Sequence, residues 1–222
     1  QPKGQGWIDP DTYYGPGTYQ AALHAAGTAC DLALRIANSD GDNGFALVRP
    51  PGHHASADRA MGFCLLNNVA VAAAAVRATG RRVSIVDFDV HHGNGTEEIF
   101  ARDGGVQVIS LHQFPFYPGS GAATSIGEGN GRGAIINIPL PEASAGPEYK
   151  LAMRRLVVPA LRRFAPDVIL VSAGFDGHAQ DTLAGMSLVE DDYAAMVASL
   201  LTVQDRLLLV LEGGYQPSAL AA

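Results

Sequence analysis

Short apolar runs alternate with longer alanine- and leucine-rich segments along the chain. Six short runs have the length of buried strands: 45–48, 83–88, 106–111, 134–140, 168–171 and 207–211. Five longer segments have helical spacing: 18–38, 67–79, 95–102, 148–164 and 190–204. Strands that are apolar on both faces and separated by helices predict an α/β fold, with a central, mostly parallel sheet flanked by helices in three layers.

Turn-forming residues separate these elements. Residues 1–16 are rich in Gly, Pro, Asp and Tyr and are predicted to form a loop. The cluster at 39–44 and Gly80 supply stop signals after the first two helices. The glycine-rich segments 119–121 and 127–133 lack the Lys-Ser/Thr pair of a phosphate-binding P-loop and are predicted to be loops. No repeat or linker divides the sequence, which predicts a single domain over residues 1–222.

Composition narrows the class of protein. The 222 residues include 15 Lys and Arg against 22 Asp and Glu, which gives a net charge of −7. With 47% hydrophobic and 17% charged residues, the chain is expected to bury a sizeable core, and its acidity disfavours a nucleic-acid binder. Cys30 and Cys64 are too few for a disulfide framework. The apolar run 69–76 is too short for a bilayer, which needs about 20 residues, so we expect a cytoplasmic protein without membrane or nucleic-acid partners.

Polar clusters follow four of the predicted strands. They occupy residues 49–54, 87–95, 172–178 and 212–215, and they contain five of the seven histidines. In open α/β sheets, functional groups gather beyond the carboxyl ends of the strands. These clusters are therefore the candidates for a functional site.

Asp89 and His91 are spaced so that both side chains point to the same side of an extended segment. Alone, such a pair is more often a helix-capping Asp beside an ordinary polar His. Asp176, at the end of another strand, completes a set of three, and three protein ligands with an open position are typical of catalytic zinc. Because the donors mix oxygen and nitrogen, Fe²⁺, Co²⁺ or Mn²⁺ would also fit.

His53 and His54 follow a Pro-Pro-Gly turn. On their own they would be an ordinary surface pair, but beside a metal site a histidine can accept and return the proton of a water molecule. Such a histidine needs a partner on its other ring nitrogen. Asp87 and Asn94 are the candidate partners.

The last cluster ends in Tyr215. Its phenol follows two glycines, and it either donates a hydrogen bond into a cleft or closes the rim of the core. The sequence contains neither a Gly-x-Ser-x-Gly elbow nor a catalytic-cysteine context, which disfavours covalent catalysis.

Five motifs occur along the chain: 49–55 (RPPGHHA), 62–68 (GFCLLNN), 87–96 (DFDVHHGNGT), 172–176 (SAGFD) and 211–215 (LEGGY). In this order they resemble the zinc-dependent histone deacetylase and acetylpolyamine amidohydrolase family. The resemblance implies the arginase-deacetylase fold. It also implies hydrolysis of the amide bond of N-acetyl-lysine, or of a related acyl-lysine or small acylamine, to a free amine and a carboxylate.

The resemblance assigns catalytic roles to the polar clusters. Zinc would be bound by Asp89, His91 and Asp176. His54 would be the general base and later the general acid, supported by Asn94. His53 would be its electrostatic partner, oriented by Asp87. Tyr215 would donate to the acyl oxygen as it becomes an oxyanion.

Two further sets follow from the same resemblance. The substrate would be contacted by a rim carboxylate, tunnel-wall residues and a lip residue: Asp11, Gly62, Phe63, Tyr117 and Leu183. A structural potassium ion would be bound, together with backbone carbonyls of Asp89 and His91, by Asp87, Ser110 and Leu111.

Departures from the class I pattern make the chain similar to the class II-like, bacterial-type branch. Class I members have a second Asp where this chain has Asn94, and the Glu212-Gly-Gly-Tyr motif also resembles class II. Some class II members have His at the position of Tyr215 and deacetylate poorly, so Tyr215 implies ordinary activity. Leu183 stands near the place where polyamine-selective relatives can carry an acidic gatekeeper, which favours acyl-lysine substrates.

Three alternatives stay open. The first is an acetylpolyamine amidohydrolase. A binuclear manganese ureohydrolase would need carboxylates where this chain has Gly93 and His178, which disfavours it. An inactive domain that only binds acyl-lysine is the third, because the family domain is longer and we expect N- and C-terminal segments of it to be missing here. The sequence leaves the oligomeric state open.

Overall fold

A computed structural model of the chain describes residues 4–39 and 41–221, so residues 1–3 of the predicted N-terminal loop and Asp40 of the predicted turn lie outside it. Its strands are β1 (Gly6–Trp7), β2 (Tyr13–Tyr14), β3 (Asn43–Ala46), β4 (Val83–Asp87), β5 (Val106–Gln113), β6 (Ile135–Leu140), β7 (Val168–Ala173) and β8 (Leu207–Leu211). Its helices are α1 (Thr18–Ala37), α2 (Asn68–Arg77), α3 (Asn94–Phe100), α4 (Gly146–Ala152), α5 (Val158–Phe164), α6 (Glu190–Leu201) and α7 (Pro217–Leu220). Two shorter stretches are a 3₁₀ turn, η1 (Gly129–Gly131), and a π-helical segment, η2 (Met153–Val157).

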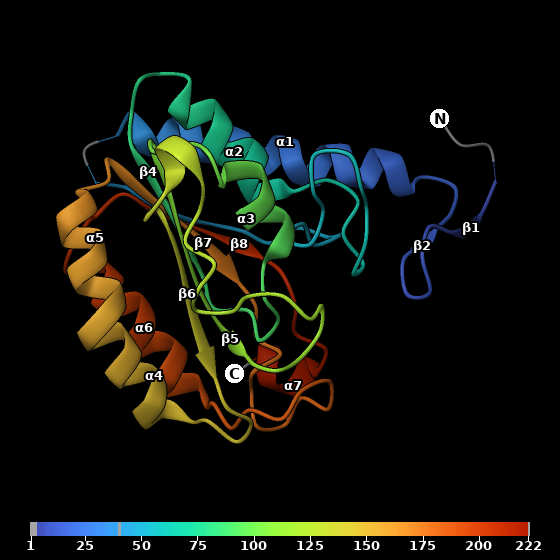
Figure 1. Ribbon diagram of the computed structural model, residues 1–222. Helices are drawn as coiled ribbons and strands as arrows, with labels where there is room; N and C mark the ends of the chain where they lie inside the picture. The colour runs from blue at the N-terminus through green and yellow to red at the C-terminus, as the bar shows by residue number, and fades with distance from the viewer. Residues whose placement is uncertain (1–3, 40, 222) are drawn as a thin grey trace.

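The central sheet has six strands in the order β3-β8-β7-β4-β5-β6, and each neighbouring pair is parallel. Helices α1, α2 and α3 lie on one face of this sheet, and α4, α5 and α6 lie on the other (Figure 1). This arrangement confirms the predicted three-layer α/β fold.

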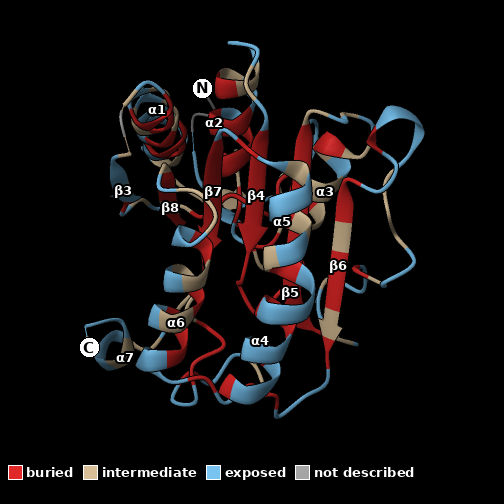
Figure 2. Ribbon diagram, turned by 90° about the vertical axis from the view of Figure 1, so that its left-hand side faces the viewer, coloured by how far each residue is buried: buried red, intermediate tan, exposed pale blue. Residues whose placement is uncertain are grey.

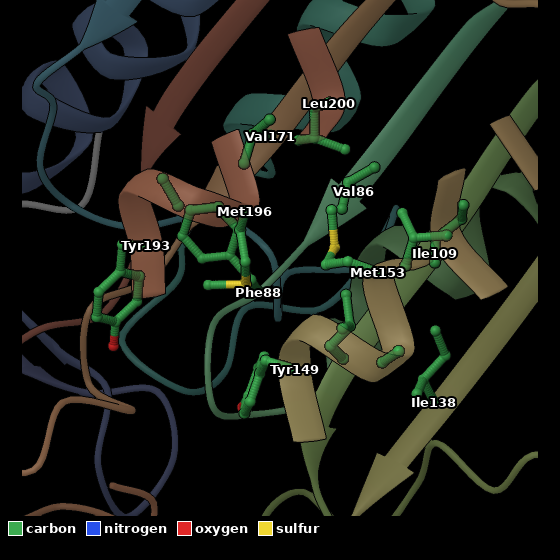
Figure 3. Close-up of a cluster of buried hydrophobic side chains, with 14 of the residues drawn as sticks. Val86, Phe88, Ile109, Ile138, Tyr149, Met153, Val171, Tyr193, Met196 and Leu200 are labelled. Carbon is green, nitrogen blue, oxygen red and sulfur yellow. The ribbon is translucent and has the colours of Figure 1, made fainter. Parts of the chain in front are cut away.

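The two faces of the sheet bury different side chains, because successive strand residues point to opposite sides. In β4, Ile85 packs in a cluster with small residues of α1 and α2 such as Ala33 and Ala73. Its neighbour Val86 packs on the other face with larger side chains, among them Tyr149 (Figure 3). The central strands β4 and β7 are consequently buried between two helical layers (Figure 2).

The strand order decides which polar clusters meet. Strands β3, β8, β7 and β4 are consecutive neighbours, and they lead into residues 49–54, 212–215, 172–178 and 87–95 respectively. Because all these strands are parallel, their carboxyl ends lie at the same end of the sheet. The fold therefore gathers all four clusters in one place.

Some local predictions were wrong. The run 45–48 is not a buried strand, because β3 ends at Ala46 and pairs with β8 alone among the described strands, and Phe45 and Leu47 are 40% and 73% exposed. The predicted loop 1–16 contains the small antiparallel hairpin β1–β2. The predicted helix 148–164 begins at Gly146 and passes through the π-helical segment η2. None of the helices in the described part of the chain combines the length and apolarity needed to span a bilayer.

Candidate active site

Three side chains from two strand ends form a group with the geometry of a metal-ligand set. Asp89 and His91 follow β4, and Asp176 follows β7. The Nδ1 atom of His91 lies 3.1 Å from Oδ1 of Asp89 and 3.1 Å from Oδ2 of Asp176. All three residues are buried, and their ligand atoms lie within 4.8 Å of one another. The structure thus brings together the three residues predicted to bind zinc.

Two glycines let the backbone approach this group closely. A Cβ atom on Gly174 would clash with the carboxylate of Asp89, and one on Gly213 would clash with the carboxylates of Asp176 and Asp89. The Gly213 N–H donates to Oδ2 of Asp89 at 2.8 Å, and the Val90 N–H donates to Oδ1 of Asp176 at 3.0 Å. Backbone groups therefore orient both carboxylates.

The charges in this group fit a bound cation. Burial and the charge of Asp89 raise the pKa of Asp176 to about 6. Burial opposes ionisation of Asp89, but His53 and His91 outweigh it and lower the pKa of this carboxyl. Burial also lowers the pKa of His91, but its hydrogen bonds to both carboxylates outweigh burial and raise the pKa to about 9. Together, the two buried carboxylates and the imidazole bind a proton. The same three side chains are a suitable donor set for a divalent metal, which would replace that proton.

His53 lies between two carboxylates. Its Nδ1 donates to Oδ2 of Asp87 at 2.9 Å, and its Nε2 lies 3.7 Å from Oδ1 of Asp89. Burial lowers the pKa of His53, but the charges of Asp87 and Asp89 outweigh burial and raise the pKa well above its usual value. The two carboxylates therefore favour the protonated form of His53.

His54 has an amide partner instead. Its Nδ1 donates to Oδ1 of Asn94 at 2.8 Å, which leaves Nε2 as a hydrogen-bond acceptor. Burial and the neighbouring His53 lower the pKa of His54 well below its usual value. The centroids of the His53 and His54 rings lie only 4.0 Å apart. His54 is thus a neutral imidazole able to accept a proton beside a charged one.

A cavity of about 340 Å³ adjoins these groups. Both histidines, Asp89 and His91 contribute to its wall. The five residues predicted to contact substrate all line it as well: Asp11, Gly62, Phe63, Tyr117 and Leu183. Its volume lies within the range of ordinary small-molecule sites, at the small end, and suits one extended side chain.

Tyr215 lies at the mouth of this cavity and is 39% exposed. Its ring packs edge to face against Phe63, with 5.9 Å between ring centroids. Burial raises the pKa of its phenol, so the hydroxyl stays protonated and able to donate. The Oδ2 atom of Asp181 accepts the Tyr215 N–H at 2.6 Å, and its Oδ1 accepts the Leu183 N–H at 3.0 Å. Asp181, which we did not predict, therefore positions both mouth residues.

Phe116 is a second residue that sequence reasoning missed. Its ring stacks on the His91 ring with 5.3 Å between centroids and 20° between planes, and it lines the cavity beside Tyr117. The signal for it was the aromatic pair between Pro115 and Pro118.

Glu212 is a third. It is completely buried, and its Oε2 accepts the N–H groups of Gly52 at 2.6 Å and His53 at 3.1 Å. The Arg49 guanidinium donates to the Glu212 backbone carbonyl. Burial raises the pKa of the Glu212 carboxyl to about 7. Glu212 thus ties the segment that carries both histidines to the end of β8.

The residues predicted to bind potassium lie where β4 meets β5. Asp87 and Ser110 are paired in register, Leu111 follows, and all three are buried. Oδ1 of Asp87 accepts the Asp89 N–H at 3.0 Å. The structure groups these residues, and potassium binding itself stays a prediction.

The described residues do not supply the ligands of a second catalytic metal beside Asp89, His91 and Asp176. His178 stands where a binuclear ureohydrolase needs a carboxylate, and its Nδ1 accepts the Gln180 N–H at 3.1 Å. Within residues 4–39 and 41–221, Asp89, His91 and Asp176 are the one group of three or more potential ligands. The geometry therefore favours a mononuclear centre.

Comparison with known proteins agrees with this site. The sequence profile of the family described as "Histone deacetylase domain" matches residues 1–222. The "Histone deacetylase-like amidohydrolase" of Pseudomonas aeruginosa is 44% identical over 222 residues, which cover 96% of this chain and 58% of that protein. A "Probable deacetylase" of Archaeoglobus fulgidus is 40% identical over 216 residues, which cover 95% of this chain and 60% of that protein.

Solved structures share the fold. The crystal structure of the HDA15 HD domain superposes with a TM-score of 0.94 at 42% identity, covering 98% of this chain and 63% of that one. The acetylpolyamine aminohydrolase from Burkholderia pseudomallei superposes with a TM-score of 0.91 at 36% identity, covering 96% of this chain and 62% of that one. The chain spans 58% to 63% of the length of these relatives and has the predicted arginase-deacetylase fold. With its whole length matched by the family profile, the chain belongs to the histone deacetylase domain family.

Proposed function

We propose that this domain hydrolyses the amide bond of N-acetyl-lysine, or of a related acyl-lysine, in a metal-dependent reaction that yields a free amine and a carboxylate. One observation carries the proposal. A single cavity is lined by two members of a buried Asp-His-Asp group, Asp89 and His91, by a histidine with an accepting nitrogen, and by the phenol of Tyr215. The names of the relatives, an amidohydrolase and a deacetylase, agree with this chemistry.

The metal would be zinc, held by Asp89, His91 and Asp176, and Fe²⁺ or Co²⁺ would fit the same donors. When bound, such an ion is a Lewis acid that polarises the acyl carbonyl and makes a water molecule more acidic. A structural potassium ion at Asp87, Ser110 and Leu111 is part of the same proposal.

His54 is the group that moves the proton. Its Nε2 accepts because Nδ1 is committed to Asn94. It takes a proton from the attacking water and returns it to the leaving amine nitrogen. The His53 cation, held by Asp87, keeps His54 neutral beforehand and stabilises negative charge that develops nearby.

The remaining residues orient the substrate. The Tyr215 hydroxyl donates to the acyl oxygen as negative charge develops on it. Phe63 and Tyr117 flank the methylene chain of lysine, and Asp11 at the rim accepts an N–H from the substrate backbone. Leu183 is an apolar lip that is 43% exposed.

A second substrate class has one observation in its favour, because a structural relative is an acetylpolyamine aminohydrolase. Leu183 offers no charge to the ammonium groups of a polyamine, so we favour acylated lysine side chains of proteins over acetylated polyamines. Since the chain spans 58% to 63% of its relatives, an acyl-lysine-binding domain without turnover is the outcome that activity measurements must exclude.

The test is a substrate panel on the purified chain loaded with Zn²⁺, Co²⁺, Fe²⁺ or Mn²⁺. The panel contains an acetyl-lysine peptide, longer acyl-lysine peptides and acetylated polyamines. We expect one metal ion per chain and release of acetate from the peptide, with loss of turnover in His54→Ala and Tyr215→Phe. Two manganese ions per chain, or metal binding without turnover of any acyl substrate, would contradict the proposal.

A further inference from the structure

One loop separates the proposed catalytic cavity from a second, larger one. Residues 114–127, named here the wall loop, connect β5 towards β6. Phe116 and Tyr117 line the catalytic cavity, whereas Pro118, Ser120 and residues 124–127 line a cavity of about 800 Å³ on the other side. Whatever holds the wall loop therefore decides where Phe116 and Tyr117 stand.

Two buried histidines hold the middle of the wall loop. Nδ1 of His92 lies 2.8 Å from Oγ of Ser120, and Nε2 of His112 donates to the Gly121 carbonyl at 2.9 Å. The centroids of the two rings lie 4.8 Å apart. A Cβ atom on Gly121, whose φ is +93°, would clash with both rings, so the loop backbone lies directly against them.

Glu97 of α3 connects His92 to the far end of the wall loop. Its carboxylate accepts from Nε2 of His92 at 2.9 Å, from Nδ2 of Asn137 at 2.7 Å and from the Ser125 hydroxyl. Asn137 of β6 also donates to the Ser125 carbonyl at 3.2 Å. Burial opposes ionisation of Glu97, but these hydrogen bonds outweigh it and lower the pKa, so the carboxylate stays charged.

The wall loop in turn places two rings against the candidate catalytic groups. Phe116 stacks on His91, as described above, and Tyr117 meets the His54 ring edge to face with 5.2 Å between centroids. His92 and Glu97 do not line the catalytic cavity, so their effect on substrate is indirect, and the wall loop connects them to Phe116 and Tyr117.

We propose that His92 and Glu97 are positioning residues for substrate binding, which hold the wall loop through Ser120 and Ser125 and so keep Phe116 and Tyr117 in place. This inference rests on the proposed function for its consequence, tighter substrate binding. The anchorage of the loop itself can be measured without any activity.

The two serines allow a precise test, because their hydroxyls can be removed without changing α3 or the metal-ligand segment. In the double variant Ser120→Ala, Ser125→Ala, we expect KM for an acetyl-lysine peptide to rise on the order of tenfold. This corresponds to the loss of hydrogen bonds to a charged network. The value of kcat should change less than about twofold, since the proton-transfer groups are untouched.

Three further variants test whether the lost hydroxyl groups cause the rise in KM. The double variant Ser120→Thr, Ser125→Thr keeps both hydroxyls and should restore KM. Thr124→Ala lies in the same loop, and the Thr124 side chain hydrogen bonds to no described residue, so KM should be unchanged. Glu97→Gln keeps the shape of the side chain but replaces an accepting oxygen by an N–H donor, so KM should rise.

Hydrogen exchange read by mass spectrometry gives the activity-independent result. Amides of the wall loop should exchange faster in the double Ala variant and in Glu97→Gln, with the rest of the chain unchanged. If the wild-type protein turns over no acyl substrate, the proposed function fails and exchange alone decides the anchorage. Unchanged loop exchange, unchanged KM in an active protein, or a loss confined to kcat would each overturn the positioning role.

Discussion

His53 and His54 are neighbours in the chain, yet the fold gives their rings opposite surroundings. Nδ1 of His53 donates to the carboxylate of Asp87 at 2.9 Å, and Nδ1 of His54 donates to the amide of Asn94 at 2.8 Å. Both rings are almost completely buried, and burial lowers the pKa of each. The pKa values separate because the charges of Asp87 and Asp89 outweigh burial at His53, whereas at His54 the neighbouring His53 adds to the effect of burial. The charge of the partner, not the depth of burial, decides which ring holds a proton and which can accept one.

The most direct test of whether the two histidines have different roles is to remove each ring in turn. We expect His54→Ala to lower kcat by about 10³-fold, since a positioned general base contributes roughly 10²–10⁴-fold. His53→Ala should cost about 10²-fold, because it removes a stabilising charge and not the proton acceptor. Steady-state kinetics with metal content measured alongside checks both values. Equal losses of kcat in the two variants would contradict the separate roles, proton acceptor for His54 and stabilising charge for His53.

The next change removes the counter-charge of His53. Asp87→Asn leaves a buried imidazole without its carboxylate, so we expect a loss of about 3 kcal/mol in the free energy of unfolding, typical of a broken buried pair. Activity should fall as the pKa of His53 drops. Asp103→Asn is the matched control, because Asp103 pairs with Arg77 at the surface, 3.6 Å away, and such pairs contribute at most about 1 kcal/mol. Denaturant unfolding that showed equal losses in both variants would contradict the role of Asp87.

A smaller effect is expected when His54 receives the same kind of partner as His53. Asn94→Asp places a carboxylate at Nδ1 of His54, which favours the cation and raises the pKa of His54. Because the base must be neutral to accept a proton, activity should then be lost at a higher pH as pH falls. We expect the acid limb of the kcat/KM profile to move up by about one pH unit. An unmoved limb, or the same shift in the exposed control Asn38→Asp, would contradict this reasoning.

The smallest effect is expected at Glu212, which contacts the backbone of His53 and not its ring. In Glu212→Gln the side-chain oxygen still accepts the Gly52 and His53 N–H groups, so kcat should change by less than about threefold. Burial raises the pKa of Glu212 from 4.5 to about 7, so the wild-type protein loses stability as pH rises from about 4.5 towards 7 and this carboxyl ionises. The amide side chain of the variant does not ionise, so the variant does not lose stability in this way. Unfolding at pH 5 and pH 8 should show Glu212→Gln gaining stability relative to wild type as pH rises, and the opposite trend would contradict the assignment.

Much of the site was predictable because its residues lie in short motifs at the ends of parallel strands. The spacing of Asp89 and His91 allowed both to face one ion, and strand-end placement suggested Asp176 as the third ligand. The partners Asp87 and Asn94 were predicted for the histidine pair, and the structure forms both hydrogen bonds. These predictions worked because parallel strands bring their carboxyl ends together whatever the details of packing.

Other features could not be predicted from a local pattern. Phe45 and Leu47 are apolar, like the residues of a buried strand. They are exposed because β3 lies at the edge of the described sheet. No local motif marks Asp181, whose carboxylate accepts the Tyr215 and Leu183 N–H groups in the folded chain. Glu212 was noted as part of a motif, but its contact with the segment around His53 joins β8 to a loop far away in sequence.

The alternation of short apolar runs with helices, the clusters at strand ends and the chemistry of each cluster are properties of neighbouring residues, so the amino-acid sequence determines them directly. The order β3-β8-β7-β4-β5-β6, the partner on each histidine ring and the anchorage of Phe116 and Tyr117 by His92 and Glu97 join residues that are distant in the chain. Such contacts depend on how the sheet and its two helical layers pack, because packing alone sets the distances between separate segments. The tertiary structure therefore decides which of two adjacent histidines carries the proton.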